Sequence, residues 1–340
     1  MQLTPEIKQQ LAEQKKQCIF CKLISGEIPN AKKVFEDDKT IALLDIYPAV
    51  KGHTLFMLKE HYPMPAYVSK EELTHKLSLI PGLSQAIKSA MVRTGMNVFI
   101  AMGGVAGQQS YHFMLHLLPR EPEDKFFNFL LKRNTKTSEE DKKNISDLLQ
   151  KILPPSSTSG KSIIPSFLTK STEAATILYE DEKILCLLPD EASAKGQITV
   201  YSKTEERFIE KLSQQDSAHL FETAFQASRA IFEAMRAQGT NILLFSGESD
   251  DNPSGRLAIH ILPRWQNDSL SGLLWEPKRA AYDLDEIASK IKDKTWKIKF
   301  ELPVKKEINA SAEERVPSVL TSLSHSQQEI MQAIAQMRKS

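Results

Sequence analysis

The sequence repeats itself at a constant offset of 144 residues. The same short motifs recur in the same order, with no insertion between one motif and the next. Such a series is hard to obtain by chance, and a chain of 340 residues is long enough for about two domains with full cores. The repeat therefore predicts two copies of one domain. Its anchors are Val34–Lys39 with Leu178–Lys183, Lys51–His53 with Lys195–Gln197, Lys59 with Lys203, Asn97 with Asn241, Gly103 with Gly247, and His116–Arg120 with His260–Arg264.

Each copy has the same order of expected elements: strands, a long helix, further strands and a closing helix. Alternating apolar residues indicate the strands, and apolar residues at helical spacing indicate the helices. This order predicts an α+β fold with antiparallel sheets. The expected elements are a helix over 4–16, a hairpin over 34–45, strands over 51–59, 97–101 and 111–118, a helix over 70–93 broken at Pro81, and a long helix over about 216–237.

The repeat and the local composition also predict the domain boundaries. The segments are an N-terminal helix over 1–16, a domain over 17–153, a linker over 154–175, a second domain over 176–300 and a tail over 301–340. The linker is rich in proline and serine. The tail ends in a short helix within 318–340, which we expect to dock on the protein's own surface; binding of a protein partner is the alternative.

Two histidines occupy alternate positions of the strand expected over 111–118. The period of two places His112, Met114 and His116 on one face of the strand. Two imidazoles on a rigid strand, behind a glycine-containing loop, indicate a functional site. Two ordinary structural histidines are an equally good interpretation of the pair alone, because histidine is intermediate in burial.

This stretch resembles the signature of the histidine triad (HIT) superfamily of nucleotide hydrolases and transferases. The signature is His-x-His-x-His-x-x, preceded by Gly-Gln and followed by Leu/Ile-Pro-Arg. The resemblance covers nearly all of 17–150 and, more faintly, 176–296. HIT domains usually pair as homodimers, so it implies two HIT-like domains that form an intramolecular pseudo-dimer, much as galactose-1-phosphate uridylyltransferase carries two HIT-like halves. The matching residues are Gly107, Gln108, His112, His116, Pro119 and Arg120.

The resemblance implies a nucleotide site that lacks its nucleophile. The family uses the central histidine to attack an α-phosphorus, and here that position is Met114, whose thioether has no proton to exchange. In the second copy the position is Ala258, and Gln197 replaces His53. A purine nucleotide or another phosphate compound is the expected ligand. The residues expected to bind it are Asp45, His53, Gln108, Ser110 and His116.

Other positions weaken the expected contacts with a nucleotide. Tyr47 and Ala101 stand where the family often has asparagine or aspartate. Arg120 and Arg264 are candidate phosphate ligands, but a surface ion pair is the commoner role of an arginine.

Four residues match the ligands of zinc-carrying HIT proteins. Cys18 and Cys21 form a Cys-x-x-Cys pair, and the resemblance adds His61 and His112. Two thiolates and two imidazoles suit a tetrahedral Zn²⁺, and a closed four-ligand shell implies a structural role. A reduced dithiol beside the sheet is the alternative, and His112 could serve zinc, phosphate or both. No metal is expected in the second copy, where the equivalent positions are Ser162, Pro165, Glu205 and Arg256.

Composition narrows the class of protein. A formal net charge of +1 gives no general reason to expect nucleic acid or an acidic membrane surface as a partner. No stretch approaches the ~18 uninterrupted apolar residues of a membrane helix, and the N-terminus lacks the apolar core of a signal peptide. Three cysteines suit a reducing compartment. We therefore expect a cytoplasmic protein, with Cys186 in its core.

Three functions remain open on these grounds. The first is a catalytically silent tandem HIT protein that binds a nucleotide as a sensor or scaffold. The second is an active nucleotide phosphohydrolase or nucleotidyltransferase that uses His116 or another residue. The third is an interaction protein that recruits a partner through 318–340. The missing histidine at Met114 favours the first.

Overall fold

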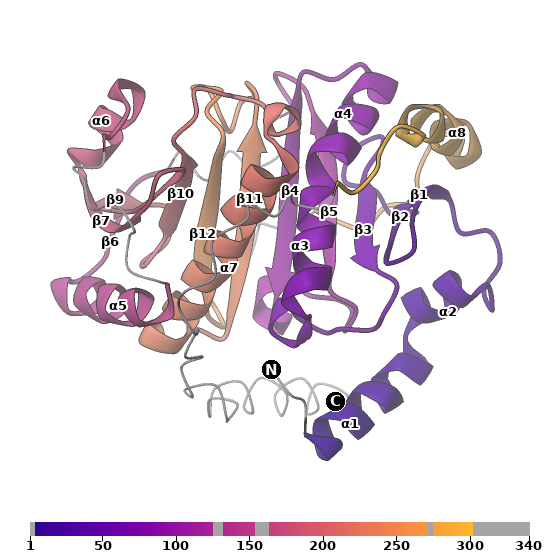
Figure 1. Cartoon of the computed structure of the whole chain (residues 1–340), viewed down its shortest axis with the longest axis horizontal. Helices are drawn as coiled ribbons and strands as arrows, with labels where there is room; N and C mark the ends of the chain where they lie inside the picture. The colour runs from indigo at the N-terminus through magenta and orange to yellow at the C-terminus, as the bar shows by residue number, and fades with distance from the viewer. Residues whose placement is uncertain (1–3, 125–131, 154–162, 269, 271–274, 302–340) are drawn as a thin grey trace, which may run out of the picture.

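A computed structural model describes residues 4–124, 132–153, 163–268, 270 and 275–301. Within this part of the chain, ten strands form one sheet in the order β1-β2-β3-β5-β4-β11-β12-β10-β8-β7 (Figure 1). All neighbouring strands are antiparallel. The strands are β1 (Lys33–Glu36), β2 (Thr40–Leu44), β3 (Thr54–Leu58), β4 (Gly95–Met102), β5 (Met114–Arg120), β7 (Ala175–Glu180), β8 (Ile184–Pro189), β10 (Ile198–Ser202), β11 (Gly239–Ser246) and β12 (Ala258–Arg264).

Helices cover this sheet, and a small second sheet links the two halves of the chain. In the small sheet, β6 (Thr135–Lys136) pairs with β9 (Glu191–Ala192). No helix in the described part of the chain is long and apolar enough to cross a membrane. The helices are α1 (Pro5–Gln17), α2 (Ile19–Ser25), α3 (Lys70–Ser78), α4 (Ile80–Met91), α5 (Glu139–Ile152), α6 (Ser166–Thr172), α7 (Gln214–Met235) and α8 (Leu284–Thr295).

The strand order is mirrored about the centre of the sheet. The first five strands belong to the first half of the chain, the other five belong to the second half, and β4 pairs with β11 between them. The bounds of β3, β4 and β5 recur, shifted by 144 residues, as those of β10, β11 and β12. The offset in the sequence is therefore also an offset in the secondary structure.

The tight turns of the two outer hairpins are held by equivalent hydrogen bonds, made by residues that repeat in the sequence. Asp37 Oδ1 accepts hydrogen bonds from two backbone amides of its turn, and Asp181 Oδ1 does the same in the second half. Each aspartate is also held by a helix, since His75 and His219 Nε2 lie 2.7 Å from Asp37 and Asp181 respectively. Burial opposes ionisation of both carboxyls, but these hydrogen bonds outweigh it and lower each pKa to about 2.

The two faces of the sheet carry different apolar clusters. On one face, α3, α4 and α7 bury a continuous core that includes Phe56, Leu115, Phe221 and Ile259. On the other face, α2 packs on a smaller cluster formed by Ile41, Leu43, Leu55, Met57 and Met114. Phe113, Leu115 and Leu117 join the first cluster, as alternation predicts, so His112, Met114 and His116 are left to the other face.

The expected elements are present, with shifts at their ends. Thr4 caps α1 by accepting a hydrogen bond from Ile7 N–H, and Pro81 lies in the first turn of α4, where its missing N–H costs nothing. The strand expected over 111–118 begins later, at Met114. Helix α6 lies inside the predicted linker 154–175. The helix predicted within 318–340 lies outside the described residues.

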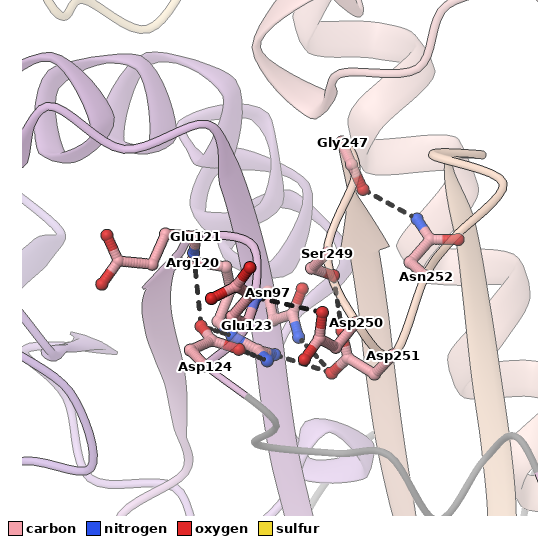
Figure 2. Close-up of polar contacts among 10 residues, drawn as sticks. All are labelled: Asn97, Arg120, Glu121, Glu123, Asp124, Gly247, Ser249, Asp250, Asp251 and Asn252. Carbon is pink, nitrogen blue, oxygen red and sulfur yellow. Dashed lines mark hydrogen bonds and ion pairs between the residues drawn. The ribbon is translucent and has the colours of Figure 1, made fainter.

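The expectation of surface ion pairs for Arg120 and Arg264 is wrong, because both side chains are buried. Figure 2 shows the loop after β11 reaching Arg120 at the end of β5, where Asp251 accepts a hydrogen bond of 2.7 Å from Arg120 Nη1. Asp124 pairs with the rest of the same guanidinium, and Asn97 Nδ2 donates to Asp251. A buried ion pair therefore joins the two halves.

The mirrored position across the junction uses a neutral contact. Arg264 pairs with Asp268 and donates through Nη1 to Asn241 Oδ1 at 2.6 Å. Asn241 Nδ2 in turn donates to Ala106 O of the first half at 2.8 Å. Each half is thus fixed by the loop of the other, but only one of the two contacts depends on a carboxylate.

We expect Asp251→Asn to lower the free energy of unfolding by about 2–3 kcal/mol, because the buried Arg120 guanidinium would lose a charged hydrogen-bond acceptor. Urea denaturation followed by circular dichroism measures this change. Glu248→Gln removes a carboxylate from an exposed position of the same loop and should leave stability within about 0.5 kcal/mol of the parent. Equal stability of the two variants would contradict a structural role for this ion pair.

Candidate functional site

The first half carries a cluster of two cysteines and two histidines beside α2. Cys18 precedes α2, Cys21 lies within it, His61 follows β3 and His112 precedes β5. The sulfur of Cys21 is 3.4 Å from His61 Nδ1, and both sulfurs are 3.6 Å from His112 Nδ1. Zinc–sulfur bonds of about 2.3 Å and zinc–nitrogen bonds of about 2.0–2.1 Å in a tetrahedron separate sulfur and nitrogen by about 3.6 Å. The cluster therefore has the size of a tetrahedral zinc shell.

The electrostatics of the cluster also suit a cation. His112 Nε2–H donates to Leu58 O at 2.7 Å, which leaves the Nδ1 lone pair directed at the sulfurs. A hydrogen bond from the Cys21 thiol lowers the pKa of Cys18, and the same contact raises the pKa of Cys21. One thiolate therefore forms readily, whereas a second beside it requires a positive charge. The donor set fits Zn²⁺.

A second cluster, formed by Asp45, His53 and His116, lies further along the same face. The backbone N–H of Ala49 donates to His53 Nδ1 at 3.2 Å, so the ring hydrogen of His53 is on Nε2. His53 Nε2–H then donates to His116 Nδ1 at 3.0 Å. These two hydrogen bonds fix the tautomers of both histidines and place the ring hydrogen of His116 on Nε2.

Burial sets the charge of this second cluster. It lowers the pKa of His53 well below the usual histidine value, with a further contribution from His116. It lowers the pKa of His116 to about 4, helped by Lys76. Burial also raises the pKa of Asp45, whose Oδ2 lies 3.4 Å from His53 Nδ1. Both imidazoles are therefore neutral at neutral pH, and His116 offers an N–H donor.

The indole of Trp275 lies against this cluster. Its ring centre is 5.2 Å from that of His53 and 5.4 Å from that of His116, both nearly edge-on. Trp275 follows β12, so a residue of the second half completes a site of the first half. Sequence analysis missed it, because the segment around Trp275 has neither strand nor helix periodicity.

Gln108 and Ser110 use their side chains within the loop before β5. Gln108 Oε1 accepts from Gly103 N–H at 2.9 Å, and Gln108 Nε2 donates to Pro63 O and Ser110 O. Ser110 Oγ accepts from His112 N–H at 3.2 Å. These bonds shape the loop, which needs a positive φ at Gly103 and Gly107.

Met114 faces an apolar surface between the two histidine positions. It lies opposite Met57 of the neighbouring strand β3 and packs in the cluster with Ile41, Leu43 and Leu55. Behind it, on the other face, the buried Lys76 Nζ donates to Phe113 O at 3.2 Å, and burial lowers the pKa of this lysine. The site therefore presents a thioether where the resemblance requires an imidazole.

The second half has different side chains at the place of the metal cluster. The guanidinium of Arg256 lies 5.0 Å above the ring of Phe167, which belongs to α6. Pro165 is the N-cap of α6, and Ser162 is outside the described residues. Cys186 is buried in β8, and burial raises the pKa of its thiol.

Comparison with known proteins assigns the first half of the chain to a sequence family. The model of the HIT domain family matches residues 25–123. Protein hit of Bacillus subtilis is 35% identical over 140 residues, which are 41% of this chain and 96% of that protein. The adenylylsulfatase HINT3 of Arabidopsis thaliana is 36% identical over 107 residues, which are 32% of this chain and 54% of that protein.

Solved structures also match the fold over most of the chain. The structure of an ADP-glucose phosphorylase from Arabidopsis thaliana with bound ADP-glucose covers 82% of this chain and 90% of its own, with a TM-score of 0.52. Its sequence identity of 14% limits the likeness to the fold. The family follows from sequence, because the Bacillus subtilis protein is matched over nearly its whole length. The chain belongs to the HIT domain family.

Proposed function

We propose that the chain is a tandem HIT protein that binds a nucleotide, or another phosphate compound, without turning it over. Residues 17–153 and 176–300 would be the two HIT-like domains of an intramolecular pseudo-dimer. The mirrored strand order and the common offset of the strands support this arrangement. Such a protein would act as a sensor or a scaffold.

One observation carries the proposal: the binding groups lie on the sheet face that carries Met114, which is not a nucleophile. Asp45, His53 and His116 form a cluster with fixed tautomers, and His116 Nε2–H is a suitable donor to a phosphate oxygen. Met114 cannot attack phosphorus or exchange a proton. A site that has hydrogen-bond donors for phosphate but no nucleophile is expected to bind a phosphate compound without cleaving it.

In this proposal, Cys18, Cys21, His61 and His112 hold a structural Zn²⁺. The Nδ1 atom of His112 would face the metal while its Nε2–H is bound to Leu58 O. Both ring nitrogens are then committed, so His112 would serve zinc rather than phosphate. The phosphate pocket keeps His53 and His116.

The alternative is an active nucleotide phosphohydrolase or nucleotidyltransferase. The relay from His53 to His116 favours it, because it positions an N–H group that would stabilise negative charge on a reacting phosphate. The names of the related adenylylsulfatase and ADP-glucose phosphorylase indicate adenylyl sulfate and ADP-glucose as compounds to test. A scaffold that recruits a partner through 318–340 is a third candidate.

Fluorescence of Trp275 tests the proposed binding directly, because the indole touches both histidines of the site. Titration with AMP, ADP-glucose and adenylyl sulfate should change the emission with at least one ligand, and Trp275→Phe should remove the change. His116→Ala should weaken binding about tenfold or more, whereas His219→Gln, on α7, should not. Chromatography of the ligand after incubation distinguishes binding from turnover, because a ligand that is only bound is recovered unchanged. Equal affinities of these two variants would refute the site.

A further inference from the structure

The second half contains a cavity of about 680 Å³, a volume typical of small-molecule sites. It is lined by residues of β8 and β10 from the large sheet and of β6 and β9 from the small sheet. Figure 1 labels β6, β9 and β10 at the left of the molecule. Residues before α5, which come from the first half, form part of its wall. The groups that matter for its chemistry are Gln197, Thr199, His260, Arg133 and Lys170.

A glutamine in this cavity makes the hydrogen bonds that a histidine makes in the first half. Ser193 N–H donates to Gln197 Oε1 at 3.1 Å, just as Ala49 N–H donates to His53 Nδ1. The amide nitrogen of Gln197 then donates to His260 Nδ1 at 3.4 Å. The replacement of histidine by glutamine therefore preserves the relay.

The relay fixes His260 as a donor towards the cavity. Nδ1 accepts from Gln197 and also from the hydroxyl of Thr199 at 3.3 Å, so the ring hydrogen is on Nε2. Within the described part of the chain, Nε2 has no hydrogen-bond partner. Burial, with Arg133 nearby, lowers the pKa of His260 to about 3, so the ring is neutral at neutral pH.

Among the residues that line the cavity, positively charged side chains outnumber negatively charged ones. Lys142 contacts Glu139 and Asp190, and Lys136 contacts Glu191. Arg133 and Lys170 line the same cavity, and the structure gives neither an ion-pair partner among the described residues. The lining residues carry four cations against three carboxylates, a net charge of +1, and Arg133 and Lys170 are the two cations without an ion-pair partner among the described residues.

We infer that this cavity binds an organic phosphate, with a phosphate oxygen on His260 Nε2–H and the remaining charge on Arg133 and Lys170. Guanidinium and ammonium groups form charge-assisted hydrogen bonds with phosphate, and a neutral imidazole adds a donor without adding charge. The cavity is larger than phosphate alone requires, so its apolar part, at Leu187 and Tyr201, accommodates the organic group. Ala258 stands two residues before His260, so no nucleophile is present there and the ligand is retained unchanged.

Calorimetry on the full-length His116→Ala protein measures this cavity with binding at the first site weakened. We expect this protein to bind one equivalent of AMP, and inorganic phosphate to compete with it. Adding Arg133→Gln should weaken AMP binding about tenfold or more through loss of a charged contact. Adding His260→Asn should do the same, because asparagine keeps an acceptor for Gln197 but lacks the Nε2 donor.

The control is Lys8→Gln in the same background, since Lys8 is an exposed cation on α1, at the other side of the molecule (Figure 1). It should leave AMP affinity within about twofold. The inference fails if the His116→Ala protein binds no AMP at millimolar concentration. It also fails if Arg133→Gln and His260→Asn bind as Lys8→Gln does. Neither failure bears on the first site, which is tested by Trp275 fluorescence in protein with an intact His116.

Discussion

Replacing Cys18 with serine is expected to release zinc and to destabilise the first half of the protein by several kcal/mol. Structural zinc sites bind with about 10–16 kcal/mol of apparent free energy at pH 7, and that energy is linked to folding. Serine cannot supply the soft thiolate that zinc prefers. Melting temperature and metal content by mass spectrometry measure the two effects together.

The geometry of α2 explains why the effect should be large. This helix has only seven residues, none of them buried, so apolar packing alone holds it weakly. Cys18 and Cys21 tie it to His61 and His112, and its partly buried residues cover the cluster at Leu43. Loss of the metal should therefore loosen α2 and expose that cluster to a hydrophobic dye.

The third cysteine provides the matched control. Cys186→Ala removes a thiol from β8, in the second half, and should leave the zinc content at one per chain despite some loss of packing. A chelator should lower the melting temperature of the parent and of Cys186→Ala but not that of Cys18→Ser. Unchanged metal content and melting in Cys18→Ser would rule out the proposed zinc site.

The sequence was informative wherever a local pattern had a single structural solution. Alternation over the strand segments predicted which face of β5 carries His112, Met114 and His116, and the structure agrees. The offset of 144 residues predicted the correspondence of the strands. The four metal-ligand candidates, taken from the family resemblance, lie within reach of one another.

The contacts between the halves could not be predicted in this way. Asp251 reaches Arg120 from a loop without periodicity, and Trp275 reaches His116 from another. Such contacts depend on how two distant segments are brought together, which no local pattern encodes. The hydrogen bonds of Gln197 could not be predicted for a different reason: its residue type differs from that of His53, but its amide has an acceptor and a donor at matching positions.

If the proposed function is correct, Met114→His is expected to give the first site a catalytic activity that the parent lacks. The new imidazole would lie on the face that carries His112 and His116, beside a neutral His116 whose Nε2–H can donate to a phosphate oxygen. Attack on an α-phosphorus would form a nucleotidyl-imidazole and break the bond to the leaving group, which takes its proton from water; a second water would then hydrolyse the intermediate, releasing the nucleotide and the free imidazole. Methionine and histidine have similar volumes, so the apolar cluster around Met57 should accept the change at a modest cost in stability.

The assay compares parent, Met114→His and Met114→Gln on adenosine phosphoramidate, a diadenosine polyphosphate and ADP-glucose. Glutamine is polar and similar in size but is not a nucleophile, so it controls for altered packing. We expect Met114→His to exceed Met114→Gln in nucleotide release by about 100-fold or more with at least one substrate. The gain should disappear when His116→Ala is added, because the hydrogen-bond donor to the phosphate oxygen is then missing.

The parent protein decides between the two leading functions. If it releases no nucleotide while Met114→His does, a HIT site has been silenced at one position and otherwise kept intact. If the parent itself turns over a substrate, and His116→Ala abolishes the rate, the protein is an enzyme with a different nucleophile and the proposed silence is wrong. If Met114→His is as inactive as Met114→Gln although both bind nucleotide, the defect extends beyond Met114, and the positions to examine next are Tyr47 and Ala101, where the family often has asparagine or aspartate.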